Sequence, residues 1–375
     1  MRRDGLDLRY LVKSMIRLWG RRPIEILWRT RNLQVGLIRS GLARRRSFKK
    51  ENLLVPMGIG ISPTFRCNLS CRGCYARFHP KEDEMTFPVI QRVMGSAVDE
   101  GVFLFVVTGG EPYLRPEMMK LYEEYSSALF WTVTNGTLID ETMARRIARC
   151  GNVFPVVSIE GGERETDRRR GEGVYRKVIG CMELLHAAGV HFGFSSVLTA
   201  DTIDLLGSRD FVSSMVDRGC TLGVFNEFIP LSPDDKDDLP GEEQKKQFRE
   251  RLPELRNWER IILIHLPYDE YDADGRCMAV GGGGLHINAL GWVEPCPFAH
   301  YARENVNDLS FREVLESPFL EAIRAHPTVL QHGEVGCSLV NNTDAFEKIV
   351  MSSGAKSTNV NPNCSLEGQI VQGDF

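Results

Sequence analysis

Short apolar segments alternate with amphipathic helical patterns through the middle of the chain, from about residue 57 to residue 265. The apolar segments show no regular polar alternation, so we expect strands that are buried on both faces. Strands of this kind, separated by helices, are joined in parallel by right-handed crossovers, which predicts a barrel or a doubly wound sheet. We predict strands at 58–62, 102–108, 130–134, 154–159, 191–197 and 222–228, with a seventh at 261–265, and helices at 87–100, 140–149, 174–188 and 209–218.

A different pattern precedes the first strand. Residues 8–19 place basic residues every four positions on one side of a helix, while leucine, valine, methionine and tryptophan fill the other side. A second helical stretch, over 24–42, leads to a basic run at 44–50. Three interpretations stay open: an anchor in the plane of a membrane surface, a helical extension packed on its own catalytic domain, and an organellar transit peptide.

Charge separates the same two regions. Residues 1–50 carry 15 basic and 3 acidic residues, so with an overall net charge of −4 the remaining chain carries −16. An acidic body repels phosphates, which argues against a nucleic-acid partner. No apolar run approaches the roughly 18 residues that a membrane-spanning helix needs. The ten cysteines are clustered, which favours a reducing cytoplasm and cysteines kept for metal over a secreted disulfide framework.

The first cluster follows the first predicted strand and consists of Cys67, Cys71 and Cys74, in a CxxxCxxC spacing. Four spaced thiolates would close a tetrahedral zinc site or saturate an iron–sulfur cubane, whereas three leave one metal position open. An iron with an open position can take a small ligand and pass it an electron. Zinc cannot pass the electron. The alternative is a structural zinc site that borrows a fourth ligand such as His79.

This spacing, followed by the sequence TGGEP at 108–112 after the second predicted strand, resembles the radical S-adenosylmethionine (SAM) superfamily over residues 57–230. The resemblance implies a partial (β/α)6 TIM-like barrel and a [4Fe–4S] cluster on the three cysteines. It also implies that the open iron binds SAM. One electron then cleaves SAM to methionine and a 5′-deoxyadenosyl radical, which abstracts hydrogen from a substrate. A donor such as flavodoxin or ferredoxin would supply the electron.

The resemblance further implies a set of SAM-binding residues. Backbone carbonyls of a glycine turn and an adjacent carboxylate suit the amino group of SAM, and a cation near the fourth strand suits its carboxylate. A polar residue after the third strand suits the ribose. These positions are Gly109, Gly110 and Glu111 for the amine, Ser158, Glu160 and Arg170 for the carboxylate, and Asn135, next to Thr134, for the ribose.

The chain departs from the family pattern at one position. Many members place an aromatic residue just before the third cysteine, where it packs on the adenine, but this chain has Gly73 there and Tyr75 just after the cysteine. The sequence therefore does not assign the adenine contact.

A second cysteine cluster begins at Cys277 and continues through Gly291 to Cys296, with the form C-x(9–15)-G-x4-C. It resembles the SPASM or shorter Twitch extension of radical SAM enzymes, which binds auxiliary iron–sulfur clusters. Cys337 is the expected third ligand of one auxiliary [4Fe–4S] cluster, and the fourth is either Cys364 or an open position. A structural zinc or buried free thiols remain the alternatives. The isolated cysteines, expected to be free and buried, are Cys150, Cys181 and Cys220.

These patterns divide the chain into a basic helical extension (1–52), a radical SAM partial barrel (53–260), an auxiliary-cluster domain (261–350) and a disordered tail (351–375). We expect an oxygen-sensitive cytoplasmic oxidoreductase. Its substrate is either lipid-like and reached at a membrane surface through residues 1–50, or a peptide, as in radical SAM maturases. A non-catalytic zinc or iron–sulfur scaffold at membranes is the alternative of another class.

Overall fold

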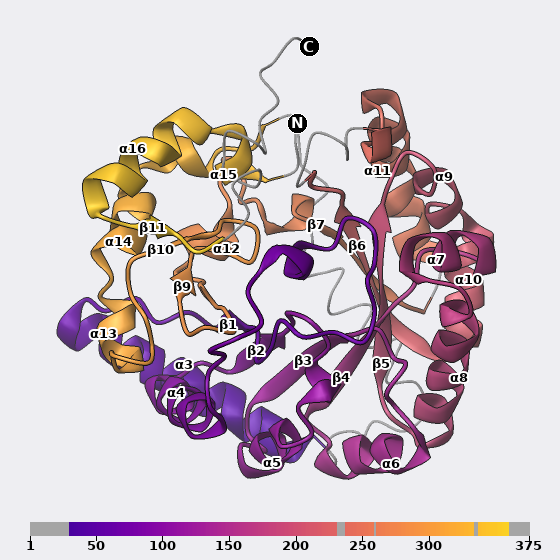
Figure 1. Ribbon diagram of the computed structural model, residues 1–375, viewed down its shortest axis with the longest axis horizontal. Helices are drawn as coiled ribbons and strands as arrows, with labels where there is room; N and C mark the ends of the chain where they lie inside the picture. Colours follow the sequence, from indigo (N-terminus) through magenta and orange to yellow (C-terminus); the bar gives the residue numbers. More distant parts are fainter. Residues whose placement is uncertain (1–29, 231–236, 259, 334–336, 360–375) are drawn as a thin grey trace.

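A curved sheet with helices on its outer side forms the body of the protein (Figure 1). The computed structural model describes residues 30–230, 237–258, 260–333 and 337–359. Nine strands of the described chain form the sheet, in the spatial order β7-β6-β5-β4-β3-β2-β1-β8-β9. They are β1 (Gly58–Ile61), β2 (Leu104–Val107), β3 (Leu129–Thr134), β4 (Val153–Ser158), β5 (Phe192–Leu198), β6 (Cys220–Glu227), β7 (Ile262–Leu266), β8 (His286–Ile287) and β9 (Val293–Glu294).

The first seven strands pair in parallel, each with the strand before it in the sequence. This arrangement confirms the predicted α/β class and the barrel-like order of strands, with β7 present where a seventh strand was expected. The strand bounds differ from the prediction by at most two residues at each end. In such a sheet the carboxyl ends of all strands meet at one rim, where active sites of β/α barrels lie.

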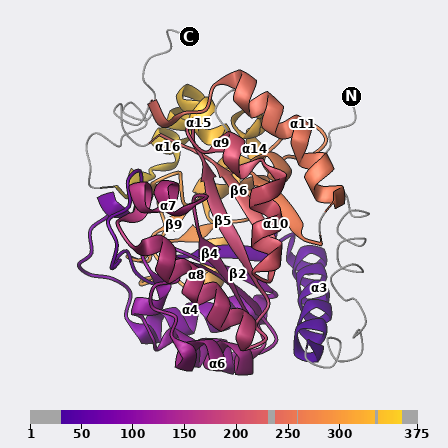
Figure 2. The same ribbon diagram turned by 90° about the vertical axis from the view of Figure 1, so that its right-hand side faces the viewer.

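Helices cover the outer face of the sheet, as Figures 1 and 2 show. Local signals fix their ends. Asp140 accepts a hydrogen bond from the amide of Met143 at the start of α6, and Gly101 ends α4 in the left-handed conformation. The helices of the barrel are α4 (Phe87–Glu100), α5 (Met118–Glu124), α6 (Glu141–Cys150), α7 (Glu163–Arg170), α8 (Val174–Ala187), α9 (Ile203–Leu206), α10 (Arg209–Asp217) and α11 (Glu242–Trp258).

The core lies between the sheet and these helices. Phe105, Phe130, Phe192, Phe194 and Phe225 project from the strands and are fully buried. Each removes a large apolar area from water, which is the main favourable contribution to folding.

One helix precedes the barrel in the described chain, α3 (Arg31–Glu51). It extends nine residues beyond the stretch predicted at 24–42 and includes the basic run at 44–50. The amphipathic pattern at 8–19 lies outside the described residues. No helix in the described part of the chain is both long enough and apolar enough to cross a membrane.

The C-terminal region joins the barrel through its sheet. The hairpin of β8 and β9 turns at Gly291, and β8 pairs in parallel with β1. Helix α12 precedes the hairpin, and α13 to α16 and a small antiparallel pair follow it. Their bounds are α12 (Met278–Gly281), β10 (Tyr301–Ala302), α13 (Phe311–Leu315), α14 (Pro318–Ala325), α15 (Ser338–Asn341), α16 (Thr343–Ser353) and β11 (Lys356–Ser357).

The expected disordered tail at 351–375 needs a partial correction. Residues 351–353 end α16, and β11 pairs with β10, so the first part of this segment is ordered. Residues 360–375, including Cys364, lie outside the described residues.

Candidate functional site

The three cysteines of the first cluster lie in the loop that leaves the carboxyl end of β1. Cys67, Cys71 and Cys74 are half-buried and are not in disulfides. Burial raises the pKa of Cys67 and of Cys71. Cys71 and Cys74 raise the pKa of Cys67 further, and Cys74 raises that of Cys71, so the three thiols lie within electrostatic range of one another. Among residues 30–230, 237–258, 260–333 and 337–359, no three His, Cys, Asp or Glu side chains lie close enough together to hold a single metal ion. A cubane instead takes each thiolate at a separate iron.

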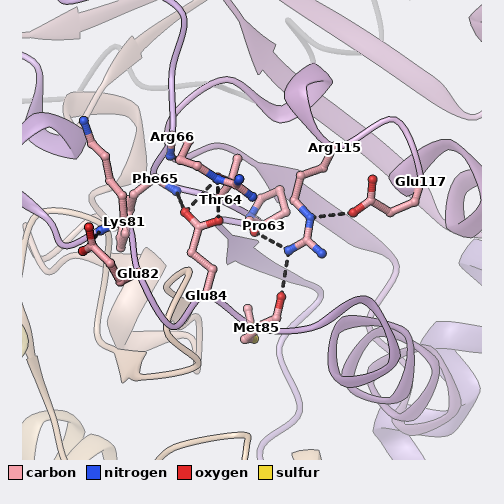
Figure 3. A network of polar contacts seen from close by, with 10 residues as sticks. All are labelled: Pro63, Thr64, Phe65, Arg66, Lys81, Glu82, Glu84, Met85, Arg115 and Glu117. Carbon is pink, nitrogen blue, oxygen red and sulfur yellow. Dashed lines mark hydrogen bonds and ion pairs between the residues drawn. The ribbon is translucent and has the colours of Figure 1, made fainter.

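The start of this loop is held by two side chains that the sequence analysis did not single out (Figure 3). The Glu84 carboxylate accepts hydrogen bonds from Thr64 Oγ1 at 2.8 Å and from the amide of Phe65 at 2.7 Å. The Arg115 guanidinium donates to the carbonyls of Pro63 at 2.9 Å and Met85 at 2.8 Å. Because these bonds fix residues 63–65, they set the direction in which the chain approaches Cys67.

The glycine turn after β2 packs directly against the same loop. The amide of Gly110 donates to the carbonyl of Thr64 at 2.8 Å, and that of Glu111 donates to the carbonyl of Arg66 at 2.9 Å. A Cβ atom at Gly110 would lie 2.0 Å from the Arg66 oxygen, and Gly109 has a φ of +106°. The two glycines are thus required by the close approach of the cysteine loop.

Glu111 is almost fully buried, and its carboxylate connects β2 to β3. It accepts hydrogen bonds from the amide of Tyr113 at 3.1 Å, from Thr134 Oγ1 at 2.8 Å and from the amide of Asn135 at 2.8 Å. Burial raises the pKa of Glu111, while these three donors oppose the rise. The carboxylate therefore has a structural role in the described chain in addition to the amine contact expected from the sequence.

Asn135 lies against the first cysteine. Its side-chain Nδ2 donates to Asn68 Oδ1 at 2.9 Å and lies 3.8 Å from Cys67 Sγ, and the amide of Leu69 donates to the same sulfur at 3.4 Å. Donors near a ligating sulfur stabilise negative charge on it. The ribose contact expected for Asn135 stays a prediction, since the side chain is already bonded to the cysteine loop.

Glu160 and Arg170 form a buried ion pair beside the second cysteine. Arg170 Nη2 donates to Glu160 Oε1 at 2.5 Å, and Arg169 Nε lies 3.4 Å from the same oxygen. Burial opposes the charge of Arg170, but Glu160 and Cys71 outweigh it and raise the pKa of the guanidinium. Arg170 Nε is buried and has no hydrogen-bond partner, so one donor of this cation remains to bind an anion. Ser158 is the last residue of β4, two positions before Glu160, and its side chain is buried.

The aromatic ring of Phe228 lies beside Gly73, the position at which the chain departs from the family pattern. Phe228 follows β6, and a Cβ atom at Gly73 would lie 3.1 Å from its ring. Arg169 covers the same ring, with Cζ 5.8 Å from the ring centroid. Tyr75 has a different use, because its hydroxyl accepts the amide hydrogen of Gly109 at 3.0 Å.

His79, the candidate fourth zinc ligand, packs among rings. It stacks on Phe65 at a centroid distance of 4.1 Å and meets His300 edge-on at 4.7 Å. Burial, helped by His300, lowers the pKa of His79 to about 3, so its ring is neutral at physiological pH. These rings lie between the first cysteine loop and the chain that follows Cys296.

The second set of cysteines also converges. The thiols of Cys296 and Cys337 hydrogen-bond to each other, which lowers the pKa of Cys337. Burial raises the pKa of Cys277 to about 11, and Cys337 lies close enough to raise it further. Residues 334–336 and Cys364 lie outside the described residues. Of the isolated cysteines, Cys181 and Cys220 are buried and Cys150 is half-buried, all without disulfides.

A buried hydrogen-bonded chain connects the two cysteine regions. Ser62 Oγ lies 2.8 Å from His286 Nε2, and His286 Nδ1 lies 2.8 Å from Glu294 Oε2. Burial alone would raise the pKa of Glu294, but the hydrogen bond from His286 brings this pKa below its ordinary value. Ser62 precedes the first cysteine loop and Glu294 precedes Cys296, so this chain fixes one loop relative to the other.

The polar side chains at the ends of β6 and β7 form mostly internal contacts. Glu227 Oε1 lies 3.1 Å from His265 Nε2, and both line a small cavity with Phe228 and Lys245. Asn226 donates to Ser195 Oγ at 2.9 Å. These contacts place Glu227 and His265 at the rim that carries the cysteine loop, next to Phe228.

Comparisons with known proteins place this chain among radical SAM proteins in sequence and in fold. The sequence model of the Radical SAM superfamily matches residues 61–207. The mycofactocin maturase MftC of Mycobacterium ulcerans is 27% identical over 272 residues, covering 68% of this chain and 72% of the relative. The PqqA peptide cyclase of Rhizobium meliloti is 26% identical over 283 residues, covering 71% and 72%. The structure of Streptococcus suis SuiB bound to precursor peptide SuiA has a TM-score of 0.61 at 16% identity, covering 85% of this chain and 78% of SuiB.

The described residues fit the cofactors of that family. Three thiols lie within electrostatic range of one another, and a buried guanidinium with an unpartnered Nε lies beside Cys71. Thiolates suit an iron–sulfur cluster, and the guanidinium suits the carboxylate of SAM. Residues 61–207 form a domain of the radical SAM superfamily, whose enzymes use a [4Fe–4S] cluster and SAM.

Proposed function

We propose that this radical SAM enzyme modifies a peptide, with Cys67, Cys71 and Cys74 as the ligands of its catalytic cluster. The observation that carries the cluster assignment is the convergence of the three thiols, the glycine turn and Arg170 at the rim of the barrel. When bound there, the cluster and SAM supply the electron and the radical that abstracts hydrogen from the substrate. The protein residues bind and orient these groups.

Arg170 has the clearest positioning role. Its Nη2 is held by Glu160, so its free Nε points in a direction that is set before the ligand arrives. A fixed guanidinium in a buried site binds a carboxylate more strongly than a mobile surface cation does. Glu160 thus acts through Arg170 and does not contact the carboxylate itself.

Phe228 is the proposed wall of the adenine site. Its ring lies beside Gly73, where many relatives carry an aromatic side chain of their own, and the Arg169 guanidinium lies over it. A flat ring against the adenine contributes stacking energy. The sequence alone does not reveal this residue, because Phe228 and Gly73 are 155 positions apart in the chain.

We also propose that Cys277, Cys296 and Cys337 bind one auxiliary cluster. The support is the direct contact between Cys296 and Cys337 and the proximity of Cys277 to Cys337. The ring cluster of Phe65, His79 and His300 lies between the two cysteine regions.

The peptide substrate is supported by relatives. One is called a peptide cyclase, and SuiB, which has the same fold, was crystallised with a precursor peptide. We further propose that the enzyme works in the cytoplasm, receives electrons from a flavodoxin or ferredoxin, and contacts a membrane surface through its N-terminal segment. The lipid-like substrate expected as the other possibility remains the second candidate, favoured by the exposed apolar residues of α3.

Anaerobic reconstitution tests the cluster assignment. The wild-type chain should hold about eight irons if both clusters are cubanes, and Cys71→Ala should hold about four and release no 5′-deoxyadenosine from SAM. Cys150→Ala is the matched control, because Cys150 lies at the end of α6 away from the cysteine loops. Full iron content in Cys71→Ala would refute the assignment.

The peptide substrate has its own test. Short peptides encoded beside the gene are prepared with deuterium at all carbons and incubated with enzyme, SAM and reductant. Transfer of deuterium into 5′-deoxyadenosine supports the proposal. Transfer from deuterated membrane lipid, with none from the peptides, would favour the second candidate.

A further inference from the structure

Helix α3 packs on the barrel with its small and polar side. Gly36 and Ser40 are its buried residues. The Ser40 hydroxyl donates to the carbonyl of Gly101 at 2.5 Å, and a Cβ atom at Gly36 would lie 1.8 Å from the carbonyl oxygen of Ser127. This close approach of backbone to backbone leaves no room for large apolar side chains in the contact.

The apolar side of α3 faces outward. Val35, Ile38 and Leu42 follow one another at the i, i+3, i+7 spacing of a single helix face, and they are 45%, 65% and 62% exposed. Leu37 and Phe48 are also exposed, at 47% and 57%. Helices on the surface of a globular protein normally bury such a face against the core, so α3 has the opposite orientation.

Cations surround this apolar face. The sequence of α3 contains seven basic residues and one acidic residue, Glu51, which pairs with Arg312. The exposed cations that flank the face are Arg39, Arg45, Arg46, Lys49 and Lys50. A helix with an outward apolar face bordered by Lys and Arg is the pattern of helices that lie in the interface of an anionic bilayer.

We propose that the outward face of α3, formed by Val35, Ile38 and Leu42 and the flanking cations, docks on an anionic membrane surface. Charge complementarity selects this occupant. A second protein helix would bury the apolar residues equally well, but it gives no reason for so many cations of one sign. This docking does not depend on the reaction, so its failure would remove the proposed membrane contact and leave the proposed peptide modification untouched.

The position of α3 determines how the enzyme would sit on the membrane. Its contacts at Gly101 and Ser127 precede β2 and β3, whereas the cysteine loop and the glycine turn follow β1 and β2. In a parallel sheet these are opposite ends of the strands. Figure 2 shows α3 along one side of the body. The bound enzyme would therefore present the rim with the cysteines to water, and a substrate from solution would reach that rim while the enzyme stays on the bilayer.

Sedimentation of the full-length holoenzyme with vesicles tests the proposal. The probes are vesicles of phosphatidylcholine alone and of phosphatidylcholine with phosphatidylglycerol. We expect binding to the anionic vesicles that weakens with salt. Ile38→Asp should lower the partition coefficient at least about tenfold, because it removes an apolar side chain that the bilayer would bury and adds a charge of the wrong sign. Arg45→Glu with Arg46→Glu should lower binding to anionic vesicles by about tenfold or more.

Controls on another helix separate docking from a general change in charge. Met351→Asp and Lys348→Glu alter an exposed apolar residue and an exposed cation of α16, and neither should change binding. Equal binding by wild type and Ile38→Asp would overturn the proposal. So would loss of binding in Leu11→Asp but not in Ile38→Asp, which would assign the membrane contact to residues 8–19. A dimer in solution that Ile38→Asp converts to a monomer, without vesicle binding by either form, would identify the face as a self-association surface instead.

Discussion

Replacement of Gly110 by alanine tests whether the glycine turn holds the cysteine loop. The new Cβ atom would lie 2.0 Å from the Arg66 oxygen, 2.6 Å from the Arg66 carbonyl carbon and 2.7 Å from the Phe65 carbonyl carbon. The loop would have to retreat by roughly 1.5 Å to restore an ordinary contact. That movement pulls on two backbone hydrogen bonds, from Gly110 to Thr64 and from Glu111 to Arg66.

The expected cost follows from these contacts. Overpacking of a tight contact costs about 1–3 kcal/mol, and weakening each backbone hydrogen bond costs up to about 1 kcal/mol. We expect Gly110→Ala to lower the free energy of unfolding by about 2–4 kcal/mol. Since the displaced loop carries Cys67, iron bound after reconstitution should fall as well.

Gly180→Ala is the matched control. Gly180 lies within α8, and a Cβ atom there would meet nothing within 4 Å. The same chemical change should therefore stabilise the protein by about 0.5–1 kcal/mol, because alanine favours helices. Anaerobic urea unfolding measures both variants, and iron analysis follows reconstitution. Equal unfolding free energies and full iron in both variants would refute the proposed dependence of the loop on Gly110.

Three further changes test other parts of the site. Asn135→Ala removes the donor near Cys67 Sγ. A hydrogen bond that favours the reduced cluster by ~1 kcal/mol raises its reduction potential by about 40 mV, so the variant should have a potential lower by that amount. A redox titration followed by electron paramagnetic resonance measures the potential, and an unchanged value argues against the contact. Phe228→Ala should weaken equilibrium binding of SAM about tenfold, and undiminished binding would remove the ring from the adenine site. His79 has a pKa of about 3 in the folded chain and about 6.5 when unfolded, so the unfolded state binds more protons between these values. The stability attributable to His79 is therefore lost as pH falls from 6.5 toward 3, by about 1.4 kcal/mol per pH unit. His79→Phe should flatten the dependence of the free energy of unfolding on pH. An unchanged slope would contradict a neutral, buried His79.

The parts of the site that lie close together in the sequence were predictable. Cys67, Cys71 and Cys74 share one loop, and the glycines of the TGGEP sequence share another, so spacing alone reveals them. The alternation of apolar segments and helices was equally readable, because strands buried on both faces have a distinct composition.

Contacts between distant segments were not predictable from spacing. Arg115 and Phe228 reach the cysteine loop from other βα units, and Glu84 lies in the same loop as Phe65 but 19 positions further along the chain. Sequence periodicity predicts the apolar and polar faces of a helix or strand. It does not say which residues of another element contact those faces. An arginine three positions after the TGGEP sequence was the one local signal that would have pointed to Arg115.

Helix α3 shows the same limit in another form. Its periodicity predicts a helix with an apolar face, and such a face is normally taken to lie inward. Gly36 and Ser40 reverse that orientation because their small side chains let the backbone approach Gly101 and Ser127. The length of the helix was also underestimated, because the predicted stretch ended at residue 42 although the lysines and arginines that follow are good helix formers.

The hairpin of β8 and β9 makes the barrel and the C-terminal region depend on each other. The amides of Gly60 and Ser62 in and after β1 donate to Leu285 and Ile287. Cutting the chain before residue 285 would leave those donors on an open sheet edge, ready to pair with another molecule. A truncated barrel prepared without residues 285–359 should therefore aggregate, and chimaeras between relatives should exchange the two regions together.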